Sequence, residues 1–208
     1  PDETKKYKLV YSLNPLAIQL KDGNTQVVYK EDNSSKISSF KKVAYFLAAQ
    51  DKNGKISYVF VSMDPFTTDV KKIGLPVKAA DAVFQQNVAN VSVKSNVEAI
   101  KSGDFADGCN IEFWPCNYGP GNEANVPGAS KDLYDFGDQK DLNKSPGYGC
   151  MQIHNFKEQQ SILCFNNFGA GSRADVGFGN WDGKSRDWTF SGSASNYSRG
   201  ELKILVLE

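Results

Sequence analysis

The chain has 208 residues, 40% of them hydrophobic and 12% aromatic, which is enough apolar material for one large core. Its 24 lysines and arginines equal its 24 aspartates and glutamates and are interleaved with them, so the sequence lacks the basic face of a nucleic-acid-binding protein. No apolar run approaches the roughly 20 residues of a membrane-spanning helix. We therefore expect no nucleic-acid partner and no membrane span.

Short runs rich in β-branched and aromatic residues recur along the chain, whereas helical periodicity is hard to find. The predicted strands, in chain order, are 8–13, 26–29, 42–48, 56–63, 90–95, 110–114, 133–136, 150–155, 161–166, 174–179, 188–191 and 201–207. Short helical pieces are predicted only over 65–72 and 79–85. Between the third and fourth strands, Asn53-Gly54 is the strongest short signal for a hairpin turn. This pattern predicts an all-β fold: a single jelly-roll-like, two-sheet β-sandwich over residues 1–208.

Four cysteines, Cys109, Cys116, Cys150 and Cys164, permit three pairings. Residues 149–165 predict a strand, a turn and a strand, and folding this hairpin about its middle places Cys150 nearly opposite Cys164. The remaining pair, Cys109 and Cys116, brackets a short strand. We expect these two disulfides and a secreted or cell-surface location, while four reduced thiols in a cytosolic protein stay open as the alternative.

Three kinds of catalytic or metal chemistry have candidate residues. His154 is the only possible histidine base, but it lies in an alternating strand pattern and no GxSxG nucleophile motif accompanies it. Paired carboxylates of a glycosidase could come from Glu112, Asp135, Asp138, Asp175, Asp182 and Asp187. The loop with Asp135 and Asp138 could bind calcium, although the same residues commonly form turns. With one histidine and no CxxC motif, a zinc site is not expected.

Aromatic and amide side chains gather between Asn110 and His154 and again near Trp181. Sugar rings stack their C–H faces on aromatic rings, while neighbouring amides and carboxylates bond the hydroxyl groups. The predicted ligand-binding residues are Trp114, Asn117, Tyr118, Tyr148, His154, Trp181 and Asp182. The alternative for each ring is a place in the hydrophobic core.

Several motifs together resemble a known bacterial module. They lie at 43–47, 61–64, 66–67, 84–88, 110–115, 117–120, 126–130, 134–139, 147–149, 151–155 and 187–190. The run Asn-Ile-Glu-Phe-Trp-Pro over 110–115 and the run Met-Gln-Ile-His-Asn over 151–155 are two of them. The module is found in bacterial proteins named sialate O-acetylesterases, and the likeness covers nearly the whole chain. The four cysteines depart from its pattern.

The resemblance implies the module and not the esterase activity. That activity would belong to a separate hydrolase domain with a Gly-Asp-Ser nucleophile motif, whereas this chain has Gly103-Asp104-Phe105 and no matching Asp-x-x-His. We predict a noncatalytic carbohydrate-recognition or accessory module of a secreted or surface glycan-processing system, with a glycan or polysaccharide as partner. Two alternatives stay open: an esterase or glycosidase acting on acetylated or charged sugars, and a structural or adhesive protein-binding domain.

Overall fold

The structure is a computed structural model that describes residues 2–16, 19–21, 24–26, 29–75, 85–114, 150–158, 160–168, 173–180 and 196–208. Most of these residues form antiparallel strands, and the described helices are short 3-10 turns. These turns are η1 (Asp2–Lys6), η2 (Ser34–Lys36) and η3 (Val70–Lys72). No helix within these ranges has the length and apolarity needed to cross a membrane.

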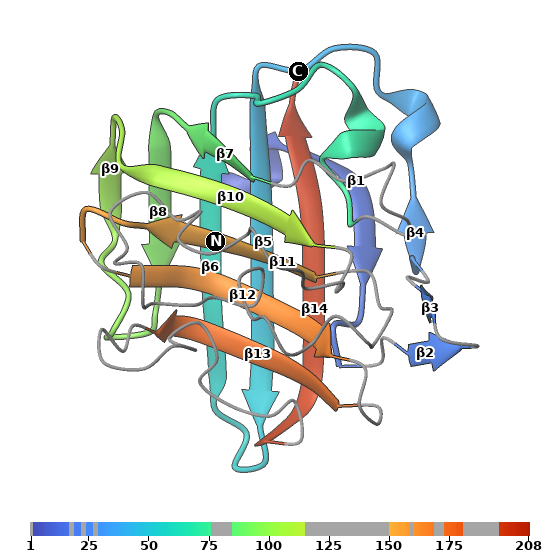
Figure 1. Ribbon diagram of the computed structural model, residues 1–208, viewed down its shortest axis with the longest axis vertical. Coiled ribbons are helices and arrows are strands. Elements are labelled where there is room, and N and C mark those ends of the chain that lie inside the picture. The colour runs from blue at the N-terminus through green and yellow to red at the C-terminus, as the bar shows by residue number, and fades with distance from the viewer. Residues whose placement is uncertain are drawn as a thin grey trace, which may run out of the picture.

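The strands form two main sheets (Figure 1). The large sheet has seven strands in the order β4 (Glu31–Asp32), β1 (Lys8–Leu13), β14 (Tyr197–Leu207), β5 (Lys42–Asp51), β6 (Ile56–Met63), β8 (Val91–Ser95) and β9 (Gly103–Phe105). The small sheet has five, in the order β13 (Arg173–Asn180), β12 (Gln160–Phe168), β11 (Cys150–Asn155), β10 (Cys109–Trp114) and β7 (Gln85–Val88). A separate short pair joins β2 (Gln19–Lys21) to β3 (Asn24–Gln26). The predicted all-β, two-sheet sandwich is confirmed.

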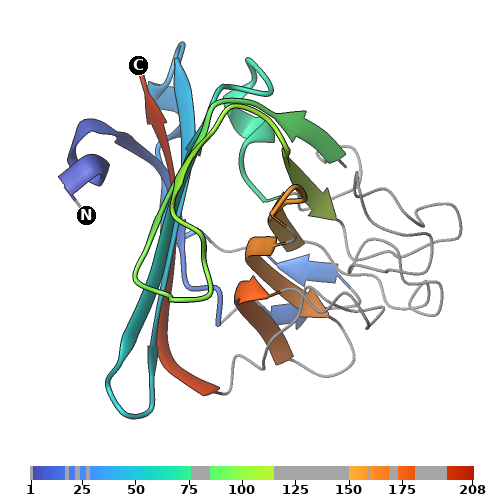
Figure 2. The same ribbon diagram turned by 90° about the vertical axis from the view of Figure 1, so that its left-hand side faces the viewer.

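The two sheets lie face to face, and their strands cross steeply (Figures 1 and 2). The chain passes between the sheets at one corner, where β7 leads into β8 and β9 leads into β10. Because β8 pairs with β9 and β7 pairs with β10, this segment is one long hairpin folded over both sheets. Strands that switch sheets in this way form the corners of orthogonal sandwiches. From β10 to β13 the small sheet is a simple antiparallel meander.

Strict alternation along β5 explains how the large sheet meets the core. Val43, Tyr45, Leu47 and Ala49 are buried against the small sheet, while the residues between them point the other way. Across the core, Phe113 of β10 is fully buried, with its ring centroid 6.4 Å from that of Tyr45. The described residues between the sheets therefore form one continuous hydrophobic core.

The most clearly patterned strands were predicted with their observed bounds. Residues 8–13, 56–63 and 150–155 form β1, β6 and β11. The Asn53-Gly54 turn is also confirmed, because Gly54 has a φ of 87° and joins β5 to β6. Within the range predicted as helix at 65–72, only the 3-10 turn η3 forms.

Other strand predictions were incomplete or lie outside the described residues. Of the strand predicted at 26–29, Gln26 ends β3 and Tyr29 belongs to no strand, while residues 27–28 lie outside the described ranges. The helix predicted at 79–85 ends where β7 begins, at Gln85, and residues 76–84 lie outside the described ranges. The strands predicted at 133–136 and 188–191 also lie outside them.

Neither predicted disulfide is present, because Cys109 and Cys164 are both buried and neither forms a disulfide. In the observed register Cys164 lies opposite Gln152, so Cys150 is two residues away from the position expected for it. Cys109 begins β10, and an extended strand carries the chain about 17 Å away by Trp114, beyond the reach of a disulfide. Burial raises the pKa of the Cys109 thiol to about 12, which keeps it protonated and unreactive.

Candidate functional site

The outer face of the large sheet turns away from the small sheet and is built by side chains from three neighbouring strands. β14 contributes Arg199, Glu201, Lys203 and Leu205; β5 contributes Phe46, Ala48 and Gln50; and β6 contributes Ile56, Tyr58 and Phe60. The pairing register places these residues side by side: Gln50, for example, lies between Arg199 and Ile56. We call this set, with Ser12 and Leu9 of β1, the outer face.

One end of the outer face contains an open groove of about 530 Å³. Its lining residues are Ser12, Leu13, Asn14, Lys30, Ala48, Ala49, Gln50, Ile56, Arg199, Gly200 and Glu201. Its volume lies within the range of about 300–1,000 Å³ that is typical of small-ligand sites. The lining combines small residues of β5 and β14 with amide and charged side chains.

The other end of the outer face is aromatic and apolar. Phe46 and Tyr58 have ring centroids 6.2 Å apart, and Tyr7 meets Phe60 edge-on at 5.5 Å. A second hollow of about 290 Å³ lies here, lined by Thr4, Tyr7, Leu9, Phe46, Lys203 and Leu205. Arg199 in the groove and Leu205 in this hollow are six residues, or about 20 Å, apart on β14. We call the strip of the outer face between them, with both hollows, the track.

Among the described residues, the acidic groups at the groove have hydrogen-bond or ion-pair partners, whereas two of its cations do not. Glu201 forms an ion pair with Lys203 at 3.6 Å. The Ser12 hydroxyl donates a hydrogen bond of 3.1 Å to the Glu31 carboxylate, just outside the groove lining. Within the described part of the chain, Arg199 and Lys30 have no carboxylate partner. The groove therefore has two cationic groups available to a ligand.

A second polar site lies on the outward side of the small sheet. His154 is fully buried, and its Nδ1 lies 2.8 Å from Oδ1 of Asn110, directly across the β10–β11 pair. Since an amide oxygen only accepts, the imidazole donates through Nδ1. Burial lowers the pKa of His154 to about 3, so the ring is neutral at physiological pH.

Ser161 lies opposite His154 in the β11–β12 pair, so it would be the nucleophile if His154 were a catalytic base. Its hydroxyl is buried and makes no hydrogen bond. The nucleophile–base hydrogen bond that activates a catalytic serine is therefore missing. Asn110 Nδ2 is also buried without a partner, which makes Asn110 and Ser161 candidates for binding an ordered water.

Most of the predicted ligand and metal residues lie outside the described ranges. These are Asn117, Tyr118, Asp135, Asp138, Tyr148, Trp181 and Asp182. Trp114 ends β10, but the described residues do not include its side chain. His154 is described and buried, and its contact with a ligand stays a prediction. Among the described residues, no three His, Cys, Asp or Glu side chains are grouped to hold a metal ion, and a calcium site at Asp135 and Asp138 also stays a prediction.

The sequence prediction missed the outer face. Its signal was present in the alternation of Phe46, Ala48 and Gln50 with buried neighbours, and in the aromatic pair that Phe46 makes with Tyr58. The partners from β14, however, are about 150 residues away in sequence, so only the sheet order brings them together. Comparison of the chain with models of protein families, with curated proteins and with solved structures finds no match.

Proposed function

We propose that this domain is a noncatalytic carbohydrate-recognition or accessory module of a secreted or surface glycan-processing system, and that its outer face binds sugar. The observation that carries the proposal is the track on the outer face, with an open polar groove at one end and aromatic rings at the other. Sugars present both apolar C–H faces and hydroxyl groups, so a site with small apolar, aromatic and amide groups side by side matches them.

The chemistry of the groove supports binding over reaction. Its lining residues include neither histidine nor cysteine, and its one hydroxyl side chain, that of Ser12, donates to Glu31. A serine held by a carboxylate lacks the imidazole that serves as a base in the familiar hydrolases. The neutral, buried His154 belongs to the other sheet and does not line the groove.

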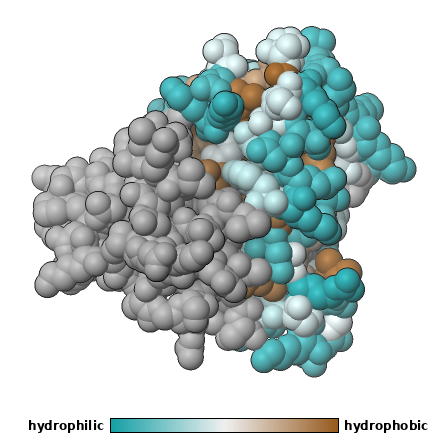
Figure 3. All heavy atoms as spheres, turned by 90° about the vertical axis from the view of Figure 1, so that its right-hand side faces the viewer, coloured by the Kyte–Doolittle hydropathy of each residue, from teal (hydrophilic) through white to brown (hydrophobic). Residues whose placement is uncertain are grey.

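The polarity of the described surface favours a sugar over a protein as the partner. Figure 3 shows that the side next to β1 and β4 is mainly hydrophilic where it is described, with small hydrophobic spots. Among the described residues, Ile56 is the one large hydrophobic side chain that is strongly exposed, at 54%. A protein-docking surface would instead show a broad apolar patch.

Glycan-array screening followed by calorimetry tests this function. We expect a glycan to bind, and we expect Tyr58→Ala and Gln50→Ala each to weaken the binding about 10-fold, which corresponds to the loss of one stacking contact or one hydrogen bond. Lys72→Ala, on the exposed η3 turn and outside both hollows, is the matched control and should bind like the wild type.

Two results would overturn the proposal. The first is that no glycan on the array binds. The second is that both outer-face variants bind unchanged, while Tyr118→Ala and Trp181→Ala lose binding. That pattern would move the sugar site to the aromatic residues predicted from the sequence.

A further inference from the structure

We propose that the groove at one end of the outer face selects carboxylated sugars, such as uronic-acid units, over neutral ones. This inference rests on the proposed function, because it concerns the ligand class of the same site. It starts from two cations of the groove lining, Arg199 and Lys30, which have no carboxylate partner among the residues that the structure describes.

Two acidic groups at the groove already have partners. Glu201, the one acidic residue of the lining, pairs with Lys203, and Glu31 accepts the hydrogen bond of Ser12. The lining itself therefore contains two cations and one anion, and the anion is held by a third cation outside the lining. A ligand carboxylate would provide a counter-charge for Arg199 and Lys30, whereas a neutral sugar would not.

The side chains present suit a carboxylate on a sugar ring in particular. A guanidinium group offers parallel N–H donors that match the two oxygens of a carboxylate, and Lys30 adds a second positive charge. Besides Glu201 and Ser12, the rest of the lining consists of apolar residues and two amides, Asn14 and Gln50. These groups fit the ring and its hydroxyls, and two cations are too few for the repeated phosphate contacts of a nucleic acid.

Lys30 and Arg199 are far apart in the sequence, and only the fold brings them to one groove. Lys30 is held beside β1 because its backbone N–H donates to the carbonyl of Ser12 at 2.7 Å. Arg199 lies on β14 opposite Gln50. The two cations line one groove only because β1, β14 and β5 are neighbours.

The test compares one oligosaccharide in two chemical forms. Calorimetry would measure the dissociation constants of an oligogalacturonate and of the same oligomer with its carboxylates reduced to alcohols. We expect the wild-type domain to bind the acidic form at least 10-fold more tightly at low salt, and we expect this preference to shrink as salt is added. Arg199→Gln and Lys30→Gln should each reduce the preference, because each substitution weakens binding of the acidic form more than binding of the reduced form.

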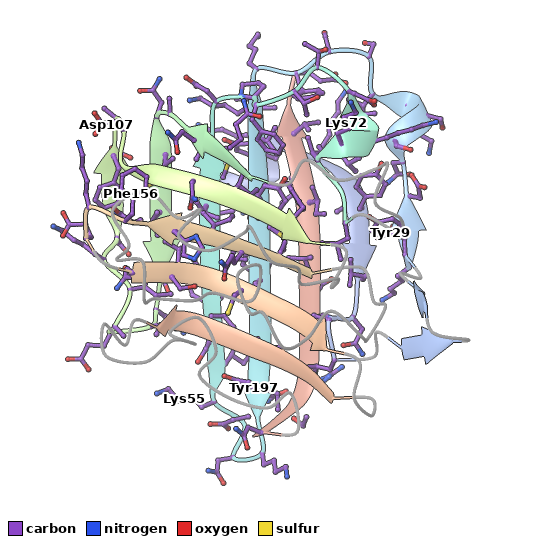
Figure 4. The ribbon with its side chains drawn as sticks, in the orientation of Figure 1. Tyr29, Lys55, Lys72, Asp107, Phe156 and Tyr197 are labelled. Carbon is purple, nitrogen blue, oxygen red and sulfur yellow. The ribbon has the colours of Figure 1, made fainter. Side chains whose placement is uncertain are left out.

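The control is Lys72→Gln, because Lys72 lies at the opposite end of the sandwich from the β5–β6 hairpin with Lys55 (Figure 4). It removes the same charge outside the groove and should keep the full preference. Equal binding of the two forms, or an unchanged preference in both groove variants, would overturn the inference and leave the proposed function in place. If neither form nor any glycan on the array binds, the proposed function falls together with the inference.

Discussion

Replacing Phe113 with alanine is expected to lower the free energy of unfolding by about 3–5 kcal/mol, the usual cost of truncating a fully buried phenylalanine. The ring is 0% exposed and lies on β10 in the small sheet. Its centroid is 6.4 Å from that of Tyr45 in the large sheet and 6.0 Å from that of Phe66. The substitution therefore opens a cavity where the two sheets meet, and urea unfolding measures the loss.

The matched control is Ile56→Ala, which removes a large side chain that is already 54% exposed. Its cost should be a small fraction of the cost at Phe113, because little apolar area returns to water. Phe113→Leu, which keeps most of the buried volume, should fall between the two. A loss below about 1 kcal/mol for Phe113→Ala would contradict the packing of the two sheets described above.

Lowering the pH from 7 to 5 is expected to cost about 2 kcal/mol of stability through His154 alone. The pKa of this histidine is about 3 in the folded state, because burial disfavours the charged ring, and about 6.5 in the unfolded chain. Between these values the unfolded state binds the proton and the folded state does not. The contribution of His154 to stability is therefore complete above pH 6.5 and is lost progressively as the pH falls toward 3.

The pH prediction can be assigned to one residue because the chain has a single histidine. Urea unfolding at pH 7, 6 and 5 gives the slope, and His154→Gln should flatten it over this range. NMR titration of the wild-type imidazole supplies a measurement that does not depend on the variant folding. An imidazole that titrates near pH 6.5 in the folded domain would show that His154 is not held neutral in the interior.

The sequence predicted the fold class because most strands alternate cleanly or are bounded by strong turn residues. β6 and its Asn53-Gly54 hairpin are the clearest examples. β9, which is short and consists of Gly103, Asp104 and Phe105, has almost no local strand signal and forms by pairing with β8. Its pairing partner, and not its own composition, makes it a strand.

The disulfide prediction failed for a related reason. Folding the segment 149–165 about its middle assumes an even hairpin, whereas the β11–β12 pair contains an irregularity between Ile153 and His154. One extra residue at such a point shifts every later pair by one and moves Cys164 from opposite Met151 to opposite Gln152. The other residue of the displacement arises because the pairs next to the turn centre the hairpin half a residue later than the assumed middle. Register of this kind depends on the packing of both faces and cannot be read from cysteine spacing.

The candidate site was missed for the same reason, because its residues come from strands that are far apart in the sequence. The outer face joins Gln50 to Arg199 and Phe46 to Lys203, and these pairs are separated by about 150 residues in sequence. No local pattern reports that β14 lies between β1 and β5, so the sequence directed attention to the aromatic residues from Asn110 to His154. The chemistry expected there, neutral hydrogen-bonding groups near aromatic rings, is also present on the outer face.

Mapping the bound glycan onto the domain tests the central claim most directly. Backbone amide shifts would be followed by NMR during titration with the tightest glycan found on the array. The account predicts that the largest shifts fall on the outer-face residues of β5, β6 and β14, around Gln50, Tyr58 and Glu201. Shifts confined to β10–β12 of the small sheet, with the outer face unchanged, would contradict it.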